Sequence, residues 1–329
     1  MSFFSVLLAL LIEQLRPLPR VNGVHEALVA WTRWAGRNFD AGREHHAWVV
    51  WGVTVAGPTL LVWAIYVALL QFSLLLAFAW NVAVLYVTLG FRHFSHFFTD
   101  IRDALERGDE VTARRLLAQW RHLDASELPR DELLRQVIEH ALLAAHRHVF
   151  GVFFWFVVLA TVGLGPAGAV LYRLSEFASR YWSYKNRTVG ITMNERLAAR
   201  SQAMFGAIDH VPARLTAFGF AVVGNFEEAI SCWRRDAELW RQRNDGIVLA
   251  AAAGAVGVRL GGKAPPPLAP DRSQGFGAGA SPQEAEAAGS TPGITPELGH
   301  LRSVVGLVWR SVVLWMLLLA LLTLANLTG

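Results

Sequence analysis

The stretch that decides the fold is residues 47–91, AWVVWGVTVAGPTLLVWAIYVALLQFSLLLAFAWNVAVLYVTLGF. Its 45 residues include no Asp, Glu, Lys, Arg or His. A helix that crosses a bilayer needs roughly 20 apolar residues, so this run is long enough for two. The sequence therefore predicts a transmembrane helical hairpin over 47–91, with its turn near Gln71.

Further apolar runs place the whole chain in the membrane class. Residues 149–172 and 311–329 are also free of charged residues and histidine, and 53% of the chain is hydrophobic, with 13 tryptophans. The apolar start, 3–12, is short for a span and has no signal-peptide features, so its place in or beside the bilayer stays open. We predict an all-α, polytopic integral membrane helical bundle with a small extramembrane helical domain.

The extramembrane domain is predicted over residues 92–148, which are rich in charge. Apolar residues recur at helical spacing on one helix from Phe94 to Leu105 and on a second from Val111 to Trp120. Gly108 favours a turn between them, and Asp109 can cap the second helix. A third helix, beginning after Pro129, is expected to run towards the membrane.

The run 149–172 has two interpretations, because GLGPAG at 163–168 interrupts it. The cationic segments 13–46, 92–148 and 173–210 lie on one side of the membrane if the chain re-enters and turns at Gly165–Pro166, as the positive-inside rule favours. A single tilted span is the alternative. Irregular backbone at this depth is tolerated where protein or a polar cavity surrounds it.

The predicted organisation has six parts. Residues 263–293 are rich in Pro, Gly, Ala and Ser and are predicted to form a flexible linker. The parts are an N-terminal hydrophobic segment and cationic loop (1–46), the transmembrane hairpin (47–91), the extramembrane helical domain (92–148), membrane or re-entrant helices (149–262), the linker (263–293) and a C-terminal transmembrane helix (294–329).

A cation beside a proline marks the main candidate site, DHVPARLTAF at 209–218. Pro212 suits the first turn of a helix, and Asp209 can cap that turn. Arg214 then lies inside an apolar helix, where an unpaired cation near lipid is costly. Arg214 either extends to the lipid headgroups or binds an anion such as a phosphate.

Several other chemistries are not favoured. The four histidines at the borders of membrane runs (His93, His96, His146 and His148) match no metal motif, so no metal site is predicted. Lys263 follows glycines but precedes Ala264, which does not complete a phosphate-binding loop. The single cysteine, Cys232, excludes an internal disulfide and is expected to pack as a small hydrophobe. The positive charges are scattered, which argues against nucleic acid as a partner.

Several of these stretches together resemble the CobD/CbiB family of membrane-bound cobalamin-biosynthesis proteins. PARLTA (212–217) and GVRLGG (257–262) are the most specific pieces. GPAGAVLYRL and the closing RSVVLWMLLLALLTL occur in the same order as in the family, while GDEVTARRLLAQW and IEHALL match more loosely. The resemblance spans most of the chain after residue 90.

The resemblance implies a cobinamide-phosphate synthase, which joins aminopropanol phosphate to a corrinoid carboxyl with ATP and Mg²⁺. The residues at positions that match the family pattern, and so expected to bind an anionic ligand, are Arg214, Arg173, Arg259 and Glu139, with Pro212 beside Arg214. The chain departs from the pattern at LAAHRH (143–148), SEFA (175–178) and Phe205–Gly206, where the family has polar or acidic residues. These departures remove candidate Mg²⁺ ligands and predict reduced or absent catalysis, so the catalytic residues stay unassigned.

A second resemblance offers an alternative. The N-terminus and VPARL…VVGNFEEAISCW (211–233) resemble AmpE, a membrane protein linked by name to β-lactamase induction, which would make the chain a non-catalytic sensor or regulator. Both readings place the chain in the bacterial inner (plasma) membrane as a multi-pass protein. The expected partners are the lipid bilayer and an anionic or phosphorylated small molecule, and a membrane-protein partner is compatible with either reading.

Overall fold

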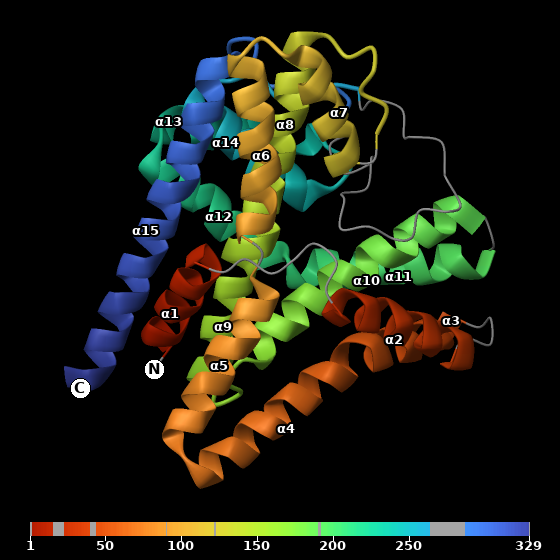
Figure 1. The fold of residues 1–329 in the computed structure, drawn as a ribbon, viewed down its shortest axis with the longest axis vertical. Coiled ribbons are helices and arrows are strands. Elements are labelled where there is room, and N and C mark those ends of the chain that lie inside the picture. The colour runs from red at the N-terminus through yellow and green to blue at the C-terminus, as the bar shows by residue number, and fades with distance from the viewer. Residues whose placement is uncertain are drawn as a thin grey trace. The chain divides into compact units, whose positions relative to one another are not determined.

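The computed structural model describes residues 2–15, 23–39, 44–89, 91–121, 123–189, 192–263 and 287–328. These residues are mostly helical, and within them strand pairing is limited to isolated bridges (Figure 1). The predicted all-α class is therefore confirmed. The chain divides into two compact units, one of residues 1–93, 147–209 and 319–329 and the other of residues 94–146 and 210–318.

The first unit contains the predicted hairpin. Its elements are α1 (Ser2–Leu15), α2 (Gly23–Phe39), α3 (Glu44–Trp51), the π-helical turn η1 (Gly52–Ala56), α4 (Gly57–Phe72), α5 (Leu74–Thr88), α9 (Gly151–Thr161), α10 (Ala167–Val189) and α11 (Thr192–Ile208). The hairpin turns at Ser73, two residues beyond the predicted Gln71. Ser73 has extended backbone and is the N-cap of α5. Its hydroxyl accepts a hydrogen bond from the Leu75 amide in the first turn of that helix.

The chain also turns back within the interrupted run 149–172. Helix α9 ends at Thr161, and Gly163 and Gly165 adopt φ of 82° and 55°, which only glycine takes up readily. Helix α10 then packs closely against α9, because a Cβ at Gly168 would overlap the backbone carbonyl of Trp155. The predicted turn at Gly165–Pro166 is present. Whether it lies within the bilayer stays a prediction.

The second unit contains the predicted helices of segment 92–148 and the family-like glycine segment. Its elements are α6 (Phe91–Glu106), α7 (Glu110–Arg121), α8 (Arg130–Ala145), α12 (His210–Val223), α13 (Phe226–Asp236), the 3-10 turn η3 (Ala237–Leu239), α14 (Arg243–Val256) and most of α15 (Leu298–Thr328). The π-helical turn η2 (His146–Phe150) continues α8 into α9. Phe97, Ile101 and Leu105 are buried as predicted, whereas Val111 is 75% exposed. The side chain of Phe94 lies outside the described residues.

The predicted caps and the predicted linker have different outcomes. Asp109 accepts a hydrogen bond of 3.0 Å from the Thr112 amide, which confirms it as the cap of α7. Residues 264–286 of the predicted linker lie outside the described residues. The end of the predicted linker, 287–293, is ordered by backbone hydrogen bonds. The Ala287 amide donates to the Gly262 carbonyl, and the Thr291 amide donates to the Leu260 carbonyl. These bonds hold both stems of the segment together.

Three helices in the described part of the chain are long and apolar enough to cross a membrane. They are His46–Phe72, Arg130–Thr161 and Leu298–Ala325. The second arm of the predicted hairpin, α5, is apolar but only 15 residues long, and α1 and α12 are likewise short apolar helices. The described structure thus contains candidate spans at 46–72, at 130–161 and at the C-terminal helix.

Candidate functional site

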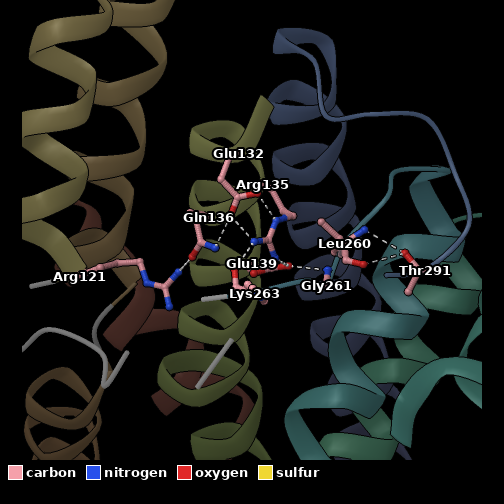
Figure 2. A network of polar contacts seen from close by, with 9 residues as sticks. All are labelled: Arg121, Glu132, Arg135, Gln136, Glu139, Leu260, Gly261, Lys263 and Thr291. Atoms are coloured by element: carbon pink, nitrogen blue, oxygen red, sulfur yellow. Dashed lines mark hydrogen bonds and ion pairs between the residues drawn. The ribbon is translucent and has the colours of Figure 1, made fainter. Parts of the chain in front are cut away.

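One face of α8 carries a polar network of the second unit, shown in Figure 2. Glu132, Arg135, Gln136 and Glu139 have the i, i+3, i+4 and i+7 spacing that brings helical side chains together. Every residue of α8 from Leu133 to Ala145 is buried, so protein surrounds the helix on all sides along this stretch. Charged side chains on such a helix must be paired within the protein.

Arg135 is the centre of this network. Its Nε donates to Glu132, and its Nη1 donates to Glu139 Oε1 over 3.0 Å. Its Nη2 donates both to Glu132 and to the backbone carbonyl of Lys263, the latter over 2.9 Å. The guanidinium is therefore paired with two carboxylates and also binds the Lys263 carbonyl.

Glu139 connects α8 with the glycine segment. Its side chain has 0% exposure, and its Oε1 accepts a second hydrogen bond, of 2.7 Å, from the Gly261 amide. Gly261 has φ of 90°, and a Cβ there would come within 2.5 Å of the Gly289 carbonyl oxygen. Only glycine fits this position, where the amide turns towards the carboxylate.

The other oxygen of Glu139 is a buried acceptor. None of the described residues donates a hydrogen bond to Oε2. A buried acceptor left without a donor costs about 1–3 kcal/mol. A hydrogen-bond donor at this oxygen, from water or from a ligand, would remove that cost.

Arg121 extends the network to α7. Its side chain is among the largest fully buried ones, and its Nη1 donates to Gln136 Oε1. Gln136 in turn donates to Glu132 over 3.1 Å. On the far side, the Thr291 hydroxyl accepts from the Leu260 amide over 2.9 Å, next to Gly261 (Figure 2). The network thus joins α7, α8 and both stems of segment 264–286.

A second buried polar cluster lies in the first unit, on α10. Glu176 is paired with Arg173 over 3.1 Å and with Arg180 over 2.6 Å. Burial raises the pKa of Glu176, but Arg180, Arg173 and Arg147 together outweigh that effect, so its pKa lies below the ordinary value. The Glu176 carboxylate is therefore held in its charged form.

The predicted site residues fall into both units. Arg173 belongs to the α10 cluster of the first unit, and the other four lie in the second. Arg214 donates to the His210 carbonyl over 2.7 Å, Pro212 is buried within the first turn of α12, and Arg259 is exposed. Of these residues, the structure places Glu139 in the α8 network.

Two other predictions concern Asp209 and Cys232. Asp209 was expected to cap α12. In the structure, its Oδ1 accepts a hydrogen bond of 2.7 Å from the Tyr172 hydroxyl of the first unit. Cys232 is buried, as expected for a packed small hydrophobe, and burial raises the pKa of its thiol. His146, another residue that the sequence singled out, is also buried, and its Nδ1 lies 2.9 Å from the Thr216 hydroxyl oxygen.

Comparison with known proteins identifies the family. The sequence profile described as CobD/CbiB protein matches residues 3–286. The chain belongs to the CobD/CbiB family. The cobalamin biosynthesis protein CobD of Stutzerimonas stutzeri is 33% identical over 326 residues, which cover 96% of each chain. The proteins of the same name from Chromobacterium violaceum and Leptospira interrogans are 38% identical over 189 residues and 25% identical over 187 residues, in each case about half of both chains.

These comparisons extend the family resemblance to nearly the whole chain. They give no support to the resemblance to AmpE. No solved structure is detectably similar to the chain. Within the family-like GVRLGG segment, the contact that the sequence did not predict is the one between Gly261 and Glu139.

Sequence reasoning missed Glu132, Arg135, Gln136 and Arg121. A signal for the first three was present, because the longer stretch DELLRQVIEHALL (131–143) places leucine, valine or isoleucine around the whole helix once Leu142 and Leu143 are included. A helix that is apolar all round is buried, so its charges must face partners. Nothing comparable marked Arg121, which lies in an ordinary amphipathic helix.

Proposed function

We propose that this chain acts in cobalamin biosynthesis as a multi-pass protein of the bacterial inner (plasma) membrane. The observation that carries the proposal is the similarity to a cobalamin biosynthesis protein CobD over 96% of both chains. Three described helices of sufficient length and hydropathy support the placement in a membrane. The amide-forming step on the corrinoid is the step that the family resemblance implies.

The α8 network is our proposed ligand site. It contains Glu139 and the GVRLGG segment, both of which match the family pattern, and Glu139 Oε2 is a buried acceptor to which none of the described residues donates. Arg135 fixes the carboxylate from one side and the Lys263 carbonyl from the other. Such an arrangement suits a ligand that offers an amine or hydroxyl to Glu139 Oε2.

The described side chains do not fit a magnesium site. No three His, Cys, Asp or Glu side chains converge within the described residues. The carboxylates of Glu132 and Glu139 are both paired with Arg135, which competes with a cation for their oxygens. No step through magnesium or ATP follows from these side chains.

Deletion of the gene tests the proposal. In the organism that carries this chain, the deletion is expected to abolish cobalamin, measured as the corrinoid pool by mass spectrometry. Corrinoids that lack the aminopropanol arm should accumulate, and the wild-type gene on a plasmid should restore the pool. An unchanged cobalamin content in the deletion strain would refute the proposed role.

A further inference from the structure

Helix α2 exposes an aromatic cluster in the first unit. Trp31 and Trp34 are 36% and 45% exposed, and their rings stack with centroids 4.9 Å apart. Phe39 packs edge-on against Trp34 at 5.5 Å. Tryptophan is enriched where a membrane protein meets the headgroup layer, because its ring is apolar and its N–H is polar.

The opposite edge of this cluster is cationic and adjoins α10. The ring of Trp182 on α10 reaches α2 so closely that a Cβ at Gly36 would overlap it. Arg33 lies three residues before Gly36 and Arg37 one residue after it, which places both near this contact. Lys185 lies three residues, about one turn, beyond Trp182. The three cations therefore lie near the contact between Gly36 and Trp182.

The electrostatics agree with this geometry. Burial lowers the pKa of Lys185, and the positive charges of Arg33 and Arg37 lower it further. Within the described part of the chain, neither arginine forms an ion pair with a carboxylate. The acid of α2, Glu26, lies seven residues before Arg33, and Glu176 of α10 is paired with Arg173 and Arg180. A negative group from outside the protein would relieve the repulsion.

A second aromatic and cationic pair lies at the start of a candidate span. Trp48 is 45% exposed on α3, two residues into the span His46–Phe72. The Arg200 guanidinium lies over its ring at 4.5 Å, and α3 packs on α11. Because α3 also contacts α2, the exposed tryptophans of both helices lie near the end of that span. In a bilayer crossed by that helix, the end of the span lies at the level of the headgroups.

We propose that Trp31, Arg33, Trp34, Arg37 and Lys185, here named the α2 headgroup site, bind the phosphate of an anionic phospholipid. The arginines and the lysine contact the phosphate, and the tryptophans lie between the headgroups and the acyl chains. Exposed tryptophans beside a membrane span favour a lipid over a soluble phosphate, which would not need them. The site is independent of the proposed role in cobalamin biosynthesis.

Native mass spectrometry of the full chain in detergent tests this proposal. The protein is titrated with phosphatidylglycerol and with phosphatidylcholine of the same acyl chains, and wild type is expected to prefer phosphatidylglycerol. The double variant Arg33→Gln/Arg37→Gln should bind phosphatidylglycerol about 25-fold more weakly, about fivefold for each cation near an anionic headgroup. Its binding of phosphatidylcholine should be unchanged.

Controls separate the site from general charge effects. Arg107→Gln/Arg234→Gln removes the same charge from exposed positions in the second unit and should leave phosphatidylglycerol binding as in wild type. Arg33→Lys/Arg37→Lys keeps the charge and should retain most of the binding. An equal loss in both glutamine double variants would overturn the proposal, as would a wild-type protein that does not distinguish the two lipids.

A competition on the wild-type protein distinguishes a lipid from a soluble anion and does not depend on any variant folding. Glycerol 3-phosphate at the concentration of the lipid is expected to leave the phosphatidylglycerol complex intact. Sodium chloride should weaken that complex and spare the one with phosphatidylcholine. Displacement by equimolar glycerol 3-phosphate would show a soluble-phosphate site and contradict the proposal.

Discussion

The carboxylate of Glu139 accepts a hydrogen bond of 2.7 Å from the backbone amide of Gly261, 122 residues further along the chain. This bond attaches the GVRLGG segment to α8, and Arg135 reinforces it through the Lys263 carbonyl. Helix α8 therefore determines where both the glycine segment and Lys263 lie. The family-like motif has its position because a buried acid and a buried guanidinium hold it.

Removing the acid should destabilise the protein. Glu139→Ala leaves the buried Arg135 with one carboxylate fewer and the Gly261 amide without its acceptor. Breaking a buried pair from one side costs about 3–5 kcal/mol. Because Glu132 still pairs with Arg135, we expect a loss of about 3 kcal/mol in the free energy of unfolding, measured by denaturation in detergent. Glu127→Ala, at an exposed acid of the same unit, is the control, and an equal effect of both changes would contradict this reasoning.

A side chain at Gly261 should also be destabilising. The backbone there has φ of 90°, and a Cβ would approach the Gly289 carbonyl oxygen to 2.5 Å. We expect Gly261→Ala to lower the free energy of unfolding by at least about 1–2 kcal/mol, the cost of a left-handed conformation with a Cβ. Gly299→Ala in α15, where a Cβ meets open space, should change it little. A Gly261→Ala protein as stable as Gly299→Ala would show that the turn is not as tight as described.

The α9–α10 hairpin depends on a small residue at position 168. A Cβ at Gly168 would overlap the Trp155 carbonyl, so Gly168→Ala must separate the two helices. Overpacking of this kind costs about 1–3 kcal/mol, and thermal unfolding in detergent should report it as a lower Tm. Gly206→Ala in α11 has room for its methyl group and serves as the control. If both variants had the same Tm as wild type, the close packing of α9 and α10 at Gly168 would be ruled out.

Stability in acid should depend on Glu176. Its folded-state pKa lies below the ordinary value of about 4.3, because the surrounding arginines outweigh the effect of burial. A lowered carboxylate pKa contributes stability that is complete above the unfolded-state pKa and disappears as the pH falls through the folded-state value. We therefore expect the free energy of unfolding to fall below about pH 4.3 in wild type.

Two variants test whether Glu176 causes this loss of stability in acid. Glu176→Gln should flatten the pH dependence between about pH 4.3 and more acid values, because the group no longer titrates. Glu195→Gln removes an exposed acid of the same unit and should keep the wild-type profile. If the free energy of unfolding of Glu176→Gln still fell in acid as in wild type, other carboxylates would be the cause.

Local sequence signals predicted local structure well. The Asp109 cap and the turn at Gly165–Pro166 follow from one or two residues with strong backbone preferences, and the break near Ser73 follows from the length of the apolar run 47–91. The contact between Glu139 and Gly261 could not be predicted in this way, because it joins segments whose distance is set by the packing of α8 and α14. The same limit applies to Arg214 and Arg173. The family resemblance implied one anionic site, and the structure gives them the separate partners His210 and Glu176.

The corrinoid pool of a gene-deletion strain that carries variants of this chain is the most direct test of the central claim, that the Glu139 network serves cobalamin biosynthesis. At equal protein levels in the membrane, the Glu139→Gln gene should restore less than about a tenth of the wild-type cobalamin, since loss of one charged hydrogen bond costs about 1.5–3 kcal/mol. The Glu127→Gln gene should restore all of it. Full cobalamin from the Glu139→Gln gene would contradict the account.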